Sequence, residues 1–198
     1  MKIKLQPANI LIFGPSGSGK GTQAQLLSEK LGVPTLSMGE LLRQAVAQKT
    51  PEGLEVRSFM DQGKWAPLEL TLRVLFPALD KHKEGFILDG YPRQFDQIAP
   101  LEEFLKTKHQ EVDKAIYLWV SDEEAAKRLV LRGQKDLAAR GKARSDEKPE
   151  VIQARLDSFH KTIDPILAYY EKYGKLLKID GERPIEPIHQ DIMAQVAK

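Results

Sequence analysis

Short apolar runs alternate along the chain with longer charged stretches. Residues 9–13 form a short apolar run, rich in β-forming residues and closed by Gly14, as expected for a strand buried on both faces. Within residues 21–31 the apolar positions recur at helical spacing, until Gly32 and Pro34 end the pattern. Further apolar runs lie at residues 33–36, 86–88, 115–120 and 176–179. Strands that alternate with helices predict an α/β fold, a doubly wound parallel sheet of about five strands flanked by helices.

Two stretches fit the core of such a sheet poorly. Residues 37–66, approximately, have a helical pattern but carry charged side chains among the leucines, which favours a small helical flap. Residues 132–148, approximately, are polar and contain Gly133 and Gly141, with few residues able to form a core. We interpret both as excursions from a single domain that spans residues 1–198.

Composition narrows the function classes. The chain has 30 Lys and Arg against 28 Asp and Glu, so its total charge gives no general attraction to nucleic acid or to anionic membranes. It has no cysteine, which removes disulfides, a thiolate nucleophile and a cysteine-based zinc site. No apolar stretch is long enough to span a bilayer. We therefore expect a cytoplasmic protein whose partners are small molecules.

The first predicted strand is followed by Gly14-Pro-Ser-Gly-Ser-Gly-Lys20-Gly-Thr22, which opens the first predicted helix. Glycines in this context let successive backbone N–H groups surround phosphate oxygens, and the helix N-terminus adds a favourable dipole. Lys20 can bridge the terminal phosphates. The sequence therefore predicts a P-loop NTPase fold. The residue after Lys20 is Gly21, so the hydroxyl that commonly binds magnesium is displaced to Thr22.

Four segments give the chain a specific resemblance. Residues 14–23, with the displaced Gly-Thr pair, resemble the P-loop of the adenylate kinase family, and residues 36–43 resemble its first monophosphate-binding segment. Residues 85–94 are similar to the family signature, and the fourth segment is a dispersed set of arginines from residue 128 to 155. Together they cover nearly the whole chain in the family's order. The resemblance is to nucleoside monophosphate kinases of the short-lid form. It implies that residues 132–148, approximately, form a lid that closes over ATP, and that residues 37–66, approximately, form a flap that closes over the monophosphate.

The resemblance implies roles for individual residues. The ATP-binding residues would be Gly17, Ser18, Gly19, Lys20, Gly21, Thr22, Arg128, Arg132 and Arg183. The monophosphate-binding residues would be Met38, Arg43, Lys64, Trp65, Ala66, Gly90, Arg93, Gln97, Arg144 and Arg155. The catalytic residues would be Lys20, Arg93, Arg128, Arg144 and Arg155, with Asp146 and Glu147 as candidate orienting partners. Asp89 would hold Mg²⁺ through water, Thr22 is a second candidate ligand, and no zinc is implied.

Arginines suit this chemistry independently of the resemblance. Transfer between two anions requires neutralisation of phosphate oxygens, and the planar guanidinium group matches paired oxygens. A monophosphate acceptor is already an anion at neutral pH, so no general base is needed.

The identity of the acceptor stays open at this point. Gln97 stands where adenylate kinases carry a glutamine able to pair with adenine, which favours AMP. Met38 stands where they usually carry a threonine, and Trp65 is bulkier than the usual aliphatic residue, so UMP or CMP is the alternative. A small-metabolite kinase or a non-catalytic nucleotide-binding module would have the same P-loop core. The resemblance also implies a monomer with ATP and AMP as its nucleotides.

Overall fold

A parallel β-sheet forms the centre of the protein, whose computed structural model describes residues 8–140 and 149–196. The sheet has five strands in the order β2-β3-β1-β4-β5, and all neighbouring strands are parallel. The strands are β1 Asn9–Phe13, β2 Thr35–Ser37, β3 Phe86–Asp89, β4 Lys114–Trp119 and β5 Leu176–Asp180. The predicted parallel α/β fold is therefore confirmed, and each predicted apolar run overlaps one of these strands.

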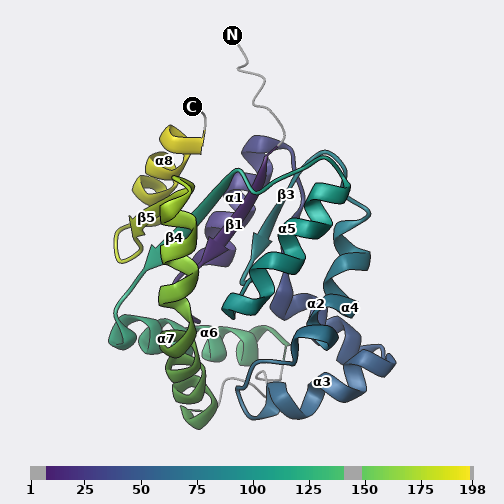
Figure 1. Ribbon diagram of the computed structural model, residues 1–198. Helices are drawn as coiled ribbons and strands as arrows, with labels where there is room; N and C mark the ends of the chain where they lie inside the picture. The colour runs from purple at the N-terminus through teal and green to yellow at the C-terminus, as the bar shows by residue number, and fades with distance from the viewer. Residues whose placement is uncertain (1–7, 141–148, 197–198) are drawn as a thin grey trace.

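One face of the sheet is covered by α1 Lys20–Leu31 and α8 Ile185–Val196. Alternate residues of β1 point to this side, where Ile10 and Ile12 join one apolar cluster with Leu27 of α1 and Ile192 of α8. In Figure 1, α1 lies behind the sheet. This layer places the start of α1 directly after the carboxyl end of β1.

The opposite face is covered by α4 Leu68–Leu79, α5 Ile98–Thr107 and α7 Pro149–Lys172. The remaining β1 side chains, including Leu11, pack here with Leu75 of α4, Leu101 of α5 and Tyr170 of α7. A short 3₁₀ helix, η1 Phe95–Gln97, precedes α5. Helices thus cover both faces, as a doubly wound sheet requires. Within residues 8–140 and 149–196, no helix combines the length and apolarity needed to cross a membrane.

Two helices, α2 Met38–Ala47 and α3 Pro51–Asp61, occupy the stretch predicted to form the flap. The Thr50 side chain accepts a hydrogen bond from the Gly53 backbone N–H at 3.0 Å and so caps α3. A β-carbon on Gly53 would lie 2.0 Å from the carbonyl oxygen of Ala45, so only glycine lets α3 approach α2 this closely. In Figure 1 the two helices lie at the lower right, beside the edge where the strand arrows end.

The predicted lid begins inside α6 Asp122–Arg140. Residues 132–140 are thus the last part of a helix, while residues 141–148, with Arg144, Asp146 and Glu147, lie outside the described residues. The N-terminal half of α6 packs on α7 through a small apolar cluster that includes Leu129 and Leu156. In Figure 1, α6 runs below the carboxyl ends of the strands. Movement of the flap and the lid stays a prediction.

Candidate active site

The loop between β1 and α1 has the geometry of a phosphate-binding loop. Gly17 and Gly19 have φ values of 91° and 88°, a region that side chains disfavour. A β-carbon on Gly17 would also lie 2.3 Å from the carbonyl oxygen of Ala125 in α6. The loop turns inward on itself, since the Ser18 N–H donates to the Pro15 carbonyl at 3.1 Å. The glycines therefore serve both the fold of the loop and the close approach of α6.

Lys20 lies at the centre of the site as the first residue of α1. Burial lowers the pKa of its ammonium group, and the nearby charges of Arg93, Arg132 and Arg155 lower it further, while Asp89 raises it. The residues that act on Lys20 come from β3, from the loop after it, from α6 and from α7. The fold thus brings three positive side chains from separate parts of the sequence, and one carboxylate, around a single lysine.

Asp89 supplies a carboxylate at the end of β3. Asp89 is paired with Ile12 of the neighbouring strand β1, so it lies near the carboxyl end of that strand. The residue is 8% exposed. Its Oδ1 is buried and has no hydrogen-bond partner among the described residues. Its Oδ2 faces Gly21, where a β-carbon would lie 3.8 Å away. An unpaired buried carboxylate oxygen beside the P-loop fits a hard cation such as Mg²⁺.

One cavity runs along the outer side of the P-loop. It is lined by all nine residues that the sequence resemblance assigns to ATP, namely Gly17, Ser18, Gly19, Lys20, Gly21, Thr22, Arg128, Arg132 and Arg183. Pro184 and Ile185 extend its wall beyond β5. The structure therefore brings the predicted ATP-binding set together on one surface.

Arg128 is held in place across this cavity. Its Nε donates to the Glu124 carboxylate at 2.7 Å, one helical turn earlier in α6. One terminal nitrogen donates to the Gly181 carbonyl at 2.9 Å and to the Ser18 carbonyl at 3.4 Å. These contacts join α6 to the P-loop and to the loop after β5. Arg128 is thereby oriented over the P-loop.

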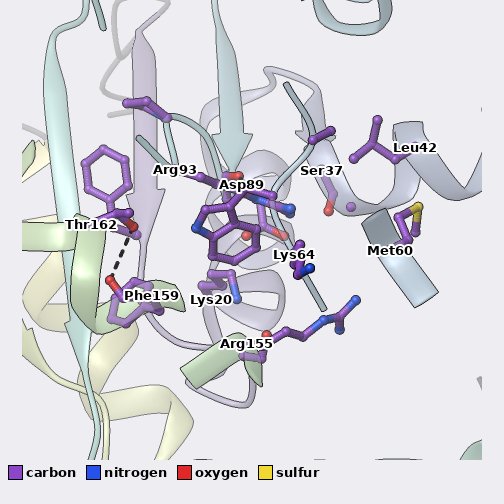
Figure 2. A pocket seen from close by; sticks show the side chains of 18 of the residues that line it. Lys20, Ser37, Leu42, Met60, Lys64, Asp89, Arg93, Arg155, Phe159 and Thr162 are labelled. Carbon is purple, nitrogen blue, oxygen red and sulfur yellow. Dashed lines mark hydrogen bonds between the residues drawn. The ribbon is translucent and has the colours of Figure 1, made fainter. Parts of the chain in front are cut away.

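A second cavity lies between the sheet edge and the flap. Its lining contains eight of the residues that the sequence resemblance assigns as catalytic or monophosphate-binding, namely Lys20, Arg43, Lys64, Trp65, Ala66, Gly90, Arg93 and Arg155. Figure 2 shows Lys20, Asp89 and Arg93 gathered in the middle of this cavity, with Leu42 and Met60 on the flap side. The cavity combines a cationic floor with an apolar wall, as binding of a nucleotide requires.

Arg93 and Arg43 converge near Gly39 of α2. A β-carbon on Gly39 would lie 3.4 Å from a terminal nitrogen of Arg43 and 3.6 Å from one of Arg93. The Nε of Arg93 donates to the Gly90 carbonyl at 2.8 Å, and its backbone N–H donates to Oε1 of Gln97 at 2.7 Å. Two guanidinium groups therefore face the same space, which suits a bound phosphate.

Two of the predicted monophosphate-binding residues lie behind the cavity rather than on it. Met38 is fully buried in the core below the flap, and Gln97 is 1% exposed. Neither is among the described residues that line the second cavity. Gln97 orients the backbone of Arg93, so its amide acts at least partly through that residue. Arg144 lies outside the described residues, and its role stays a prediction.

The apolar wall of the second cavity was missed by the sequence analysis. It includes Leu42, Val56 and Met60 from the flap and Phe159 and Ile163 from α7. A usable signal was present, because Phe159 and Ile163 follow Arg155 at intervals of four residues and so share its helical face. The flap residues gave no such signal, since their apolar side chains looked like ordinary core positions.

Comparison with known proteins agrees with this geometry. The family model described as adenylate kinase matches residues 12–175. An adenylate kinase of Nitrobacter hamburgensis is 40% identical over 92% of this chain and 89% of its own length. One of a Cyanothece species is 38% identical over 96% of this chain and 93% of its own length. One of Pseudarthrobacter chlorophenolicus is 37% identical, with 94% and 95% covered. With the P-loop, the two cavities and these similarities together, the chain belongs to the adenylate kinase family.

Proposed function

We propose that this protein transfers the γ-phosphoryl group of ATP to AMP and so forms two molecules of ADP. The observation that carries the proposal is that the two cavities share Lys20, Arg43, Asp89 and Arg132. A donor in one cavity and an acceptor in the other would bring their phosphates together at these residues. This arrangement permits direct in-line transfer without a covalent enzyme intermediate.

On the donor side, backbone N–H groups from Gly17 to Thr22 hold the ATP phosphates, and Lys20 accompanies the group in transfer. Arg128 and Arg132 approach from α6. Burial and the charges of Arg93, Arg132 and Arg155 lower the pKa of Lys20, while Asp89 raises it, so a phosphate beside the ammonium group would stabilise its charged form. The donor half therefore stabilises negative charge on the terminal phosphates of ATP.

On the acceptor side, Arg43 and Arg93 hold the phosphate of the monophosphate, and Arg155 closes over both phosphates together with Arg144. A phosphate oxygen of the acceptor is the nucleophile and is already ionised, so no residue needs to remove a proton. The arginines orient this oxygen toward the γ-phosphorus and offset the repulsion between the two anions.

Mg²⁺ bound with ATP would be held through water by Asp89, with Thr22 as a second candidate ligand at the rim. The free carboxylate oxygen of Asp89 supports this assignment. The ion would neutralise charge on the β- and γ-phosphate oxygens and orient them. Asp89 also raises the pKa of Lys20, so its carboxylate would act on both the ammonium group and the hydrated ion.

AMP is favoured over UMP or CMP because the relatives are described as adenylate kinases and because the resemblance assigns Gln97 a contact with adenine. A kinase that acts on a metabolite hydroxyl would need a base near the acceptor. The second cavity presents Arg43, Arg93 and Arg155, and the carboxylate among its described lining residues, Asp89, is the one proposed to hold Mg²⁺. We further propose a monomeric cytoplasmic enzyme whose flap and lid close over the two nucleotides.

The test is formation of ADP from ATP and Mg²⁺ with AMP, GMP, CMP or UMP as the acceptor. We expect AMP to be preferred, and Arg93→Ala to lower kcat/KM for AMP by about 30-fold or more, because it removes a paired charged contact. Preference for UMP or CMP would contradict the acceptor assignment. No transfer to any monophosphate would contradict the proposed function itself.

A further inference from the structure

The guanidinium group of Arg93 lies over the ring of Trp65 in the second cavity. The guanidinium carbon of Arg93 lies 4.7 Å from the centroid of the Trp65 ring, within the range of a cation–π contact. Both residues line the second cavity, although Trp65 comes from the loop after α3 and Arg93 from the loop after β3. The contact therefore joins the flap side of the cavity to the sheet edge.

Arg93 is one of three arginines whose charges meet in this cavity. The charges of Arg93, Arg132 and Arg155 all act on Lys20, and that of Asp89 opposes them. Like charges at close range repel one another, so a guanidinium group here gains from contacts that fix its direction. An aromatic face attracts the guanidinium plane without a negative charge and leaves the N–H groups at its edge directed outward.

Trp65 is itself held firmly by the loop that carries it. The Lys64 backbone N–H donates to the Phe59 carbonyl at 2.9 Å. On the other side, the Thr71 hydroxyl donates to the Pro67 carbonyl at 3.0 Å. The indole packs against the main apolar cluster. Its Nε1 is buried without a hydrogen-bond partner among the described residues, so packing against that cluster orients the ring.

We propose that Trp65 is a positioning residue that holds the guanidinium group of Arg93 toward the acceptor phosphate through its aromatic face. The inference rests on the proposed role of Arg93 in binding that phosphate. It assigns the indole an effect on phosphate affinity and none on recognition of the base. The prediction is therefore a change in KM that is shared by all monophosphate acceptors.

The experiment compares Trp65→Leu with Trp65→Phe at saturating ATP, with AMP and CMP as acceptors. We expect Trp65→Leu to raise KM for AMP by about three- to tenfold, and Trp65→Phe, which keeps an aromatic face, by about twofold. The AMP to CMP ratio of kcat/KM should not change. Trp119→Leu is the matched control, because Trp119 is 48% exposed and lies outside the described lining of the cavity.

A double-mutant cycle separates positioning from packing. If Trp65 acts through Arg93, Trp65→Leu should have almost no effect on KM in an Arg93→Ala background. An equal rise in KM for AMP in both backgrounds would overturn the inference. An equal rise in KM for Trp65→Phe and Trp65→Leu, or a changed AMP to CMP ratio of kcat/KM, would overturn it as well. Circular dichroism checks folding, and Trp65→Met replaces Trp65→Leu in the cycle if the leucine variant unfolds.

Failure of the proposed function would look different. Arg93→Ala alone would then leave kcat/KM for AMP unchanged, a result seen before Trp65 enters the comparison. A large loss in Arg93→Ala with no change of KM in Trp65→Leu would instead keep Arg93 in the site and reject Trp65 as its positioning residue.

Discussion

Replacement of Lys20 by methionine tests the electrostatic centre of the site. Burial lowers the pKa of the ammonium group, Arg93, Arg132 and Arg155 lower it further, and Asp89 opposes them. A lowered pKa means that the folded protein binds this proton more weakly than the unfolded chain does. The charge on Lys20 therefore costs stability in the nucleotide-free protein, and its benefit must come from bound phosphates.

The expected size of the kinetic effect follows from Coulomb's law. A unit charge about 4 Å from a phosphoryl oxygen contributes about 4 kcal/mol at an effective dielectric constant of about 20. Loss of that interaction in the transition state should lower kcat by about 10³-fold. Methionine keeps an unbranched stem of similar length, so Tm without nucleotide should stay level or rise. The gain in Tm should shrink as the pH approaches 10.5, where the lysine loses its proton in the unfolded chain too.

The assay couples ADP formation to a spectroscopic readout at saturating ATP, Mg²⁺ and AMP, and thermal unfolding is followed without nucleotide. Lys30→Met is the matched control, because it makes the same change at an exposed position of the same helix. A kcat within about tenfold of the wild type would refute the electrostatic role estimated above. A clear fall in Tm would refute the inferred cost of the buried charge.

Three further changes test separate parts of the structure. Asp89→Asn should raise the Mg²⁺ concentration for half-maximal rate by about tenfold, measured by Mg²⁺ titration at fixed ATP; an unchanged titration would remove Asp89 from the metal site. Glu124→Gln weakens the 2.7 Å contact to Arg128 and should raise KM for ATP about threefold, while KM for AMP is unchanged. Equal rises in KM for ATP and KM for AMP would argue for a general distortion of the site. His189→Leu removes two buried ring nitrogens that lack partners among the described residues and should raise the free energy of unfolding by about 1 kcal/mol. Because burial lowers the pKa of His189 below its usual 6.5, the wild type should lose stability relative to this variant as the pH falls below that value, and parallel denaturation curves across pH would contradict this.

Short sequence patterns were sufficient to predict the first strand and the phosphate-binding loop. The apolar run at Asn9–Phe13 predicts a buried strand because a strand covered on both faces needs no polar positions, and all five residues are buried. The glycines at 17 and 19 and Lys20 predict a phosphate-binding loop because that backbone shape and that charge are needed together. Fold class and donor site are therefore encoded over short distances in the sequence.

The acceptor half depended on long-range packing. The resemblance made Met38 and Gln97 candidates for the monophosphate site, yet both are buried and neither lies among the described residues that line the cavity. Conversely, Val56 and Met60 looked like ordinary core residues and prove to line the cavity. Which face of α2 or α3 lines the cavity depends on how these helices pack on the rest of the protein, and a local sequence pattern does not specify that packing.

The sequence by itself determined the alternation of strands and helices, the P-loop and the supply of arginines, because each depends on neighbouring residues or on composition. Only the tertiary structure decided that Arg93, Arg132 and Arg155 act on Lys20 and that the guanidinium group of Arg93 lies over the Trp65 ring. Lys20 and Arg93 come together because parallel strands bring their carboxyl ends to a single edge of the sheet. The loop after α3, α6 and α7 then bring Trp65, Arg132 and Arg155 to that edge.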